Sequence, residues 1–313
     1  MDDIAADTAA DQSLLPQPFA DRLVEAVELK RSQLVVGLDP RLDLLPLELR
    51  GEAQHSPEGI ADAFSRFCRG IIDAVAPYVV CVKPQLAFFE LYGSAGMRAL
   101  EDVCAHARDS GLLVIADAKR GDIGSTARAY AGAYLEPRGV QPPLADALTV
   151  NPYLGRDALE PFLLACQRHG GGVFVLLKTS NPGSADLQDL TLSDGSPVWH
   201  QLALLLQEPA ETLAGRSGIS SLGVVVGATY PRAIGEARRL LPRSIILLPG
   251  VGAQGATPAD VARAFTSGPA SALVNASRAV IYAYRSEEGL DWRAAAGSEA
   301  ARLRDEIWAV SGW

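Results

Sequence analysis

The stretch LLVIADAKRGDIGST, residues 112–126, decides the fold and locates the chemistry. Its first five residues are apolar and predict a buried strand, and Asp117 and Lys119 follow at the end of that strand. Because residues two apart on a strand share a face, both side chains point the same way before Arg120 and Gly121 begin a turn. A neighbouring carboxylate keeps a lysine protonated, so Lys119 is a candidate general acid. The alternative is a surface salt bridge worth at most about 1 kcal/mol.

Seven further apolar runs of this kind lie along the chain, between stretches with helical periodicity. They are LVVGLD (34–39), VVCVK (79–83), DALTVN (146–151), VFVLLKTS (173–180), LGVVVGA (222–228), IILLPGVG (245–252) and SALVNAS (271–277). Near-continuous apolar strands that alternate with helices indicate a parallel sheet covered on both faces. Eight such units predict an α/β fold of the (β/α)8 barrel (TIM barrel) type, and a doubly wound open sheet with an appended domain is the alternative.

The segments between the strands predict amphipathic helices, several of which end at Gly or Pro as helix stops do. The clearest are residues 61–77, 97–111, 158–170 and 259–268. Residues 1–15 are rich in Ala and Asp and show no periodicity, so we expect a disordered acidic tail there. We expect residues 16–313 to form a single barrel domain.

Composition limits the classes of function. The 313 residues are 48% hydrophobic and 21% charged, with a formal net charge of −9. No apolar run approaches the roughly 18 residues of a membrane span, and the N-terminus is acidic where a signal peptide is basic, so we expect a soluble cytoplasmic protein. The acidity and the lack of a basic stripe argue against a nucleic-acid partner. The four cysteines form no CxxC pair and the four histidines lack ligand spacing, so we expect neither a disulfide framework nor a metal site.

Polar residues stand at the ends of most predicted strands, where a barrel of this type places its active site. They are Asp39, Lys83, Asp117, Lys119, Asn151, Lys178, Thr179, Ser180, Ser277 and Arg278. Only four of the 28 basic residues are lysines, and three of these four end apolar strands, whereas Lys30 is interpreted as an ordinary surface residue. Because a charge at the end of a buried run is costly unless it is paired, the three lysines predict one inward-facing polar site. The alternative is that each lysine extends past the barrel rim into solvent.

A glycine-rich turn, PGVGAQG (249–255), follows the seventh predicted strand. It contains a GxGxxG match, but it lies outside a first βαβ unit and no acidic residue follows about 20 positions later, so an NAD-dependent oxidoreductase is the least favoured interpretation. Loops after strands seven and eight of a barrel often bind phosphate through backbone N–H groups. Thr257 and Pro258 then predict a helix start, and Arg278 offers a guanidinium to a phosphate. The alternative is a plain strand-to-helix turn.

With these residues in view, the chain resembles the orotidine 5′-phosphate decarboxylase family, in its longer form, from about residue 34 to residue 285. The motifs that carry the resemblance are DxKxxDI (117–123) with Thr126, KPQLAFFE (83–90), TSNPG (179–183), PGVGAQG (249–255) and NASRAVIY (275–282). The resemblance implies a homodimeric barrel that converts orotidine 5′-phosphate to UMP and CO2, the last step of de novo pyrimidine synthesis. It also implies a reaction without a metal or an organic cofactor.

The resemblance further implies roles for individual residues. A catalytic network of alternating charges would consist of Lys83, Asp117, Lys119 and Asp122. Asp122 and Thr126 would complete the site of the neighbouring subunit. Substrate would be bound at the ribose by Asp39, at the pyrimidine ring by Ser180, and at the phosphate by Pro249, Gly250, Gly252, Gln254 and Arg278. The extended segment between Thr179 and Leu222 leaves the conformation of the loop around Ser180 open, and Lys178 receives no role.

Two other functions stay open at this point. Hexulose-phosphate enzymes share a DxKxxD strand end on the same barrel, so a metal-dependent decarboxylase or aldolase of a phosphorylated sugar is one alternative. A non-catalytic phosphate-binding barrel is the other. Simple phosphate binding needs no carboxylates beside the ligand, so the presence of Asp117 and Asp122 speaks against it.

Overall fold

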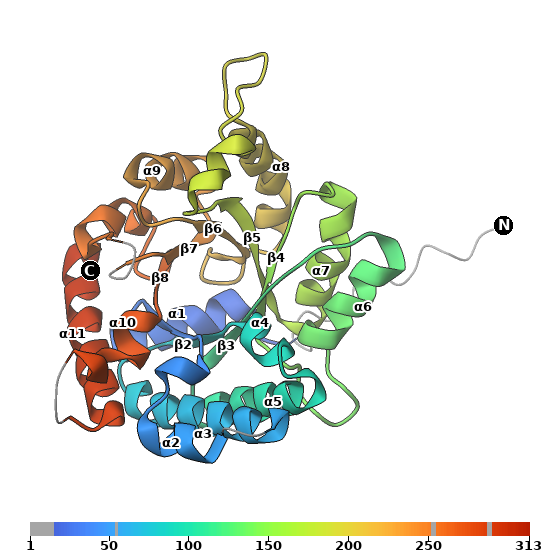
Figure 1. Cartoon of the computed structure of the whole chain (residues 1–313). Helices are drawn as coiled ribbons and strands as arrows, with labels where there is room; N and C mark the ends of the chain where they lie inside the picture. The colour runs from blue at the N-terminus through green and yellow to red at the C-terminus, as the bar shows by residue number, and fades with distance from the viewer. Residues whose placement is uncertain (1–15, 54–55, 252–254, 287–289) are drawn as a thin grey trace.

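The computed structural model describes residues 16–313 apart from 54–55, 252–254 and 287–289, so the predicted tail lies outside the described residues. Eight strands pair in parallel and in chain order into a closed barrel (Figure 1), which confirms the predicted architecture and excludes an open sheet. They are β1 (Leu34–Leu38), β2 (Cys81–Pro84), β3 (Leu113–Arg120), β4 (Ala147–Val150), β5 (Gly172–Lys178), β6 (Ser220–Val226), β7 (Ser244–Pro249) and β8 (Ala272–Ala276). The strands read as apolar runs because helices cover them outside and packed side chains fill the barrel inside.

Most helices form a ring around the barrel (Figure 1). The α-helices are α1 (Phe19–Lys30), α2 (Leu47–Ala53), α3 (Pro57–Val75), α4 (Leu86–Glu90), α5 (Gly93–Asp109), α6 (Gly124–Leu135), α7 (Arg156–His169), α8 (Val198–Thr212), α9 (Pro231–Leu240), α10 (Arg278–Ile281) and α11 (Trp292–Ser311). The 3-10 helices are η2 (Leu42–Leu44), η3 (Pro182–Asp186), η4 (Pro258–Phe265) and η5 (Ala283–Arg285). Within the described residues, none of the helices has the length and hydrophobicity that crossing a membrane requires.

The segment after the glycine-rich turn differs from its prediction. Its start is confirmed, because Thr257 forms a capping box with Asp260 and Pro258 occupies the first helical position. An α-helix over 259–268 was expected, and that prediction is wrong: the segment is the 3-10 helix η4, which ends at Phe265. A 3-10 helix closes i→i+3 hydrogen bonds and so winds more tightly than the expected α-helix, and a run of eight residues is long for this form.

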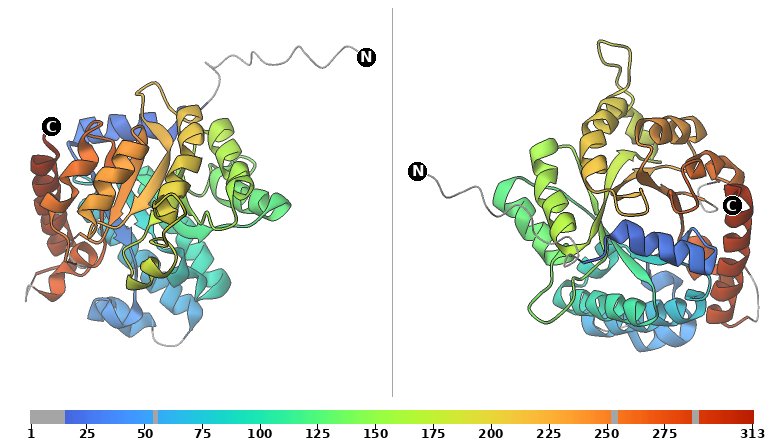
Figure 2. Two further views of the ribbon diagram at one scale, coloured as in Figure 1. Left: turned by 90° about the horizontal axis from the view of Figure 1, so that it is seen from above. Right: turned by 180° about the vertical axis from the view of Figure 1, so that it is seen from behind.

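Helix α1 lies across the N-terminal ends of the strands (Figure 2). Its side chains Phe19, Leu23 and Val27 are fully buried and join the apolar cluster inside the barrel. The ring of Phe19 meets that of Phe174 on β5 edge-on, with 5.9 Å between the centroids. Gly172 leaves room for this ring, since a Cβ at that position would lie 2.6 Å from it. Helix α1 therefore closes this end of the barrel and leaves the C-terminal end for a ligand.

Candidate active site

A cavity of about 930 Å³ opens at the C-terminal ends of the strands. Among the residues that line it are eight of those predicted from the sequence: Asp39, Lys83, Asp117, Lys119, Ser180, Pro249, Gly250 and Arg278. Asn151 and Thr179, which also follow apolar strands, line it too. Polar residues at strand ends were therefore a sound guide to the site.

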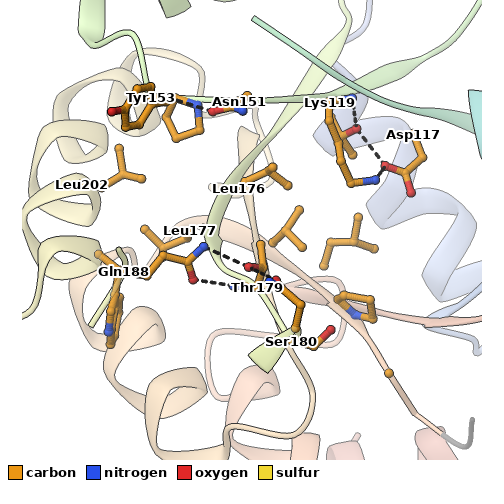
Figure 3. Close-up of a pocket in the computed structure, with 18 of the residues that line it drawn as sticks. Asp117, Lys119, Asn151, Tyr153, Leu176, Leu177, Thr179, Ser180, Gln188 and Leu202 are labelled. Atoms are coloured by element: carbon orange, nitrogen blue, oxygen red, sulfur yellow. Dashed lines mark hydrogen bonds and ion pairs between the residues drawn. The ribbon is translucent and has the colours of Figure 1, made fainter. Parts of the chain in front are cut away.

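Asp117, on the inner face of β3, is the centre of the cavity's polar side. Its Oδ2 accepts hydrogen bonds from Lys83 Nζ at 2.5 Å and from Gln85 Nε2 at 3.1 Å. Its Oδ1 accepts from Lys119 Nζ at 2.5 Å and from Thr149 Oγ1 at 3.0 Å (Figure 3). The predicted pairing of Asp117 with Lys119 is confirmed, and Lys83 adds a second ion pair. We call Lys83, Asp117 and Lys119 the charge network.

Burial distinguishes the two lysines of the charge network. The side chain of Lys83 is 7% exposed and that of Lys119 is 45% exposed. Burial alone would raise the pKa of Asp117, but the charges and hydrogen bonds of both lysines hold that pKa well below its ordinary value. Burial alone would lower the pKa of Lys83, but the carboxylates of Asp117 and Asp39 raise it. Asp117 and Lys83 therefore stay ionised at neutral pH, and Lys119 is the ammonium that a ligand can reach.

The backbone at Lys119 is strained. Its φ is 50°, in the left-handed region that favours glycine, and the register between β3 and β4 shifts near this residue. The hydroxyl of Thr149 supports this conformation by accepting a hydrogen bond from the Lys119 N–H at 2.9 Å. Glycine is required at Gly121, because a Cβ there would lie 2.9 Å from the carbonyl oxygen of Asn151. Strain of this kind is concentrated at functional sites, where the surrounding structure maintains it.

The floor of the cavity has a polar half and an apolar half. Strands β2 to β4 contribute Lys83, Asp117 and Thr149, and strands β5 to β7 contribute Leu176, Val225 and Leu247. In Figure 3, Leu176 lies to the left of the Asp117–Lys119 pair and above Thr179. Such a floor suits a flat ring that packs on aliphatic side chains and turns an anionic group toward the lysines.

Unpartnered polar groups mark the β1 and β8 side of the cavity. Oδ1 of Asp39 and Oδ1 of Asn275 are buried and accept no hydrogen bond from the described residues. The guanidinium of Arg278 lines the cavity and forms no ion pair within the same part of the chain. Glycine at Gly37 is needed here, because a Cβ would lie 1.8 Å from the hydroxyl oxygen of Ser277. Buried acceptors require donors, so this side suits a ligand that carries hydroxyls and an anionic group.

Sequence reasoning misses several polar residues that line the cavity, and three of them, Gln85, Thr149 and Asn275, lie on or next to barrel strands. Each lies two positions along the chain from a strand-end residue that the sequence singles out. Because side chains two apart on a strand share a face, extending the strand-end list by this spacing would have found all three.

Four of the predicted site residues are not placed in the cavity. Asp122 lies just before α6 and Thr126 lies in its first turn, and neither lines the cavity. Asp122 Oδ1 accepts a hydrogen bond from the Ile123 N–H at 2.7 Å. Gly252 and Gln254 lie outside the described residues. The contribution of Asp122 and Thr126 to a neighbouring subunit stays a prediction.

The interpretation of two other lysines is wrong. Lys178 was expected to face the same site as Lys83, but it does not line the cavity, because the register between β5 and β6 shifts after Leu176 and Lys178 packs elsewhere. Lys30 is not an ordinary surface lysine. Its ammonium donates hydrogen bonds to the carbonyls of Ala76 and Val79 at 3.0 and 2.9 Å, near the start of β2.

Comparisons with known proteins point to one family. The family model described as "Orotidine 5'-phosphate decarboxylase / HUMPS family" matches residues 32–290. The chain is 49% identical over 274 residues to orotidine 5′-phosphate decarboxylase of Rhodopirellula baltica, with 86% of this chain and 90% of the relative covered. It is 45% identical over 289 residues to the enzyme of that name from Deinococcus radiodurans, with 92% and 96% covered.

A solved structure is similar over almost the whole chain. The Leishmania donovani OMP decarboxylase structure matches with a TM-score of 0.72 at 32% sequence identity, and the match covers 95% of this chain and 100% of that one. Because the family model spans most of the chain and the relatives match it nearly end to end, the chain belongs to the orotidine 5′-phosphate decarboxylase / HUMPS family.

Proposed function

We propose that the chain decarboxylates orotidine 5′-phosphate to UMP and CO2, with Lys119 as the proton donor. The observation that carries the proposal is the position of Asp117, held between Lys83 and Lys119 at the edge of an apolar floor. Relatives at 45–49% identity are named for this nucleotide, which favours it over the phosphorylated-sugar alternative.

The reaction breaks the bond between C6 of the pyrimidine ring and its carboxylate carbon. The electron pair stays on C6 as CO2 leaves, and this carbanion has no neighbouring electron sink, so the protein must stabilise it electrostatically. Lys119 suits this task because its ammonium is reachable from the cavity and is oriented by Asp117. It then delivers a proton to C6, which yields UMP, and the resulting amine regains a proton from solvent.

Asp117 contributes by repulsion as well as by orientation. A substrate carboxylate placed beside Asp117 is raised in energy relative to the transition state, in which the charge has moved to C6 next to Lys119. Because the pKa of Asp117 lies well below its ordinary value, protonation does not relieve this repulsion at neutral pH. Lys83 is buried and bonded to Asp117, so it holds the carboxylate in place.

The rest of the nucleotide supplies binding energy away from C6. Arg278, with the backbone at Pro249 and Gly250, binds the phosphate, and the unpartnered oxygens of Asp39 and Asn275 accept hydrogen bonds from ribose hydroxyls. Ser180 contacts the pyrimidine ring. Binding energy at these remote groups offsets the cost of bringing two carboxylates together.

A homodimer and a cytoplasmic location belong to the same proposal. Asp122 and Thr126 lie outside the cavity of their own chain, and Ile123 between them is 57% exposed, which fits a segment that reaches a neighbouring site. The four cysteines are buried and free, as is usual for proteins of a reducing compartment.

Turnover of orotidine 5′-phosphate by the Lys119→Ala variant tests the assignment. The variant should fold, because the Lys119 side chain is half-exposed, and its turnover should fall by roughly 10²- to 10⁴-fold, the range of general acid catalysis. UMP formation is followed by chromatography, and circular dichroism checks the fold. Turnover close to that of the wild type would remove Lys119 from the mechanism.

A further inference from the structure

Lys178 is a buried charge that the proposed mechanism does not use. It ends β5, is 3% exposed and does not line the cavity. Its ammonium donates hydrogen bonds to Asp189 Oδ2 at 2.8 Å and to Ser184 Oγ at 3.1 Å. It also lies 4.8 Å from the centroid of the Tyr230 ring. A buried ammonium needs such compensation, and here it comes from the connections after β5 and after β6.

Two of these partners belong to residues 181–197, which we call the β5–α8 connection and which stand out from the barrel rim beside α8 (Figure 1). All seventeen residues of this range are described, and Ser184 is the only one that is buried. The connection therefore has almost no apolar core of its own. Its position must depend on the polar contacts that join it to the barrel.

The β5–α8 connection forms part of the cavity wall, to which it contributes Asn181, Leu187, Gln188 and Leu192. The side-chain amide of Gln188 accepts a hydrogen bond from the Thr179 N–H and donates one to the Thr179 hydroxyl, both at 2.9 Å (Figure 3). Asp189, the next residue, pairs with Lys178. Consecutive residues of the connection thus bind consecutive residues at the end of β5, which makes a two-point attachment directly before Ser180.

We propose that Lys178 is a positioning residue for the decarboxylation. Its ion pair with Asp189 fixes the wall formed by the β5–α8 connection and, through Thr179, fixes Ser180 where the substrate ring binds. Lys178 touches no substrate and acts through this wall. The inference rests on the proposed function, because it assigns the wall to the site of that reaction.

The Lys178→Met variant tests the inference. Methionine keeps an unbranched apolar side chain and removes the charge, and the side chain of Asp189 is 44% exposed, so water can hydrate the carboxylate that is left unpaired. We expect the barrel to fold and the KM for orotidine 5′-phosphate to rise about tenfold or more, the scale of one hydrogen bond to a charged group, with a smaller change in kcat. We also expect faster thermolysin cleavage before Leu187, Leu190 or Leu192.

Further variants separate positioning from stability. Lys178→Arg should keep the KM and the slow cleavage of the wild type. The double variant Lys178→Met, Asp189→Asn should have the same KM and cleavage rate as Lys178→Met alone, because the two residues act as a pair. Lys30→Met is the matched control, since it removes an ammonium bonded to the carbonyls of Ala76 and Val79 far from the wall. It should lower Tm and leave the KM and the cleavage pattern unchanged.

The outcomes are distinct. If the KM of Lys178→Met equals that of the wild type, the inference is overturned, whatever the cleavage rate. The inference is also overturned if Lys30→Met raises the KM as much as Lys178→Met does. Wild-type protein that does not turn over orotidine 5′-phosphate would contradict the proposed function instead. The cleavage rates need no substrate, so they would still decide whether Lys178 holds the β5–α8 connection.

Discussion

Replacing Asp117 by Asn changes one charge at the centre of the charge network and almost nothing in side-chain volume. The two lysines then respond differently. Lys83, with a side chain 7% exposed, loses its direct ion-pair partner and keeps only the more distant charge of Asp39. Lys119, with a side chain 45% exposed, can exchange its ion pair for water. The substitution therefore separates a lysine that the fold depends on from a lysine that is free to react.

The magnitude follows from these exposures. Removing one partner of a buried ion pair costs about 3–5 kcal/mol, because a buried charge is left unpaired. Losing the half-exposed Lys119 costs less, about 1 kcal/mol or below, because the buried Asp117 keeps its ion pair with Lys83. Asp117→Asn should therefore lower the free energy of unfolding by about 3 kcal/mol or more, and Lys119→Met by less than about 1 kcal/mol. For a chain of this size the corresponding falls in Tm are on the order of 10 °C and 2 °C.

The effect also has a pH dependence whose sign is fixed. Because the pKa of Asp117 is lower in the folded chain than in the unfolded one, its ionisation stabilises the fold above the ordinary carboxyl pKa of about 4. That contribution is lost as the pH falls toward the pKa of the folded state. The stability difference between the wild type and Asp117→Asn should therefore be present at pH 7 and should shrink below about pH 4.

The assay is urea and thermal unfolding at pH 7 and at pH 3.5, applied to the wild type, Asp117→Asn and Lys119→Met. In a separate activity measurement, both variants should lose most of their turnover. Equal losses of stability in the two variants would refute the division of roles between Lys83 and Lys119. A stability difference for Asp117→Asn that does not change with pH would refute the assigned ionisation of Asp117.

Three further predictions concern the phosphate, the dimer and the closed end of the barrel. Arg278→Ala should raise the KM for orotidine 5′-phosphate about tenfold or more without lowering Tm, and an unchanged KM would contradict the phosphate assignment. Mixing inactive Asp122→Asn and Lys119→Ala proteins should restore some activity through hybrid dimers, whereas no recovery after verified subunit exchange would argue for a site within one chain. Phe19→Ala should lower the free energy of unfolding by about 3–5 kcal/mol and leave the KM unchanged, because it leaves a cavity where a fully buried phenyl ring packs. A loss below about 1 kcal/mol would contradict the inference that α1 closes the N-terminal end of the barrel.

The barrel was predictable because each strand is buried on both faces and so reads as an apolar run. The apolar runs also predict where the polar site lies, because a charge directly after a buried strand needs a partner. Asp117 and Lys119, which pair at the end of β3, are the clearest case. The role of α1 was less accessible. Its apolar side chains are visible in the sequence, but nothing local shows that Phe19 packs against Phe174 rather than on the outside of the barrel.

Irregular backbone accounts for the main failures. The place of Lys178 at the end of an apolar strand predicts that it faces the cavity, but the register between β5 and β6 shifts after Leu176 and the side chain packs elsewhere. The positive φ of Lys119 is equally hidden, because a lysine carries no propensity for that conformation and the supporting hydroxyl belongs to Thr149, thirty residues away in the chain. Both features depend on contacts between strands that are distant in the sequence.

The central claim is tested most directly by supplying orotidine 5′-phosphate to wild-type protein freed of metal with a chelator and following the ultraviolet absorbance of the nucleotide. We predict that the absorbance falls as UMP forms in equal amount, at a rate that added divalent metal does not change. No loss of absorbance, or a loss that begins only when a divalent metal is added, would contradict the claim.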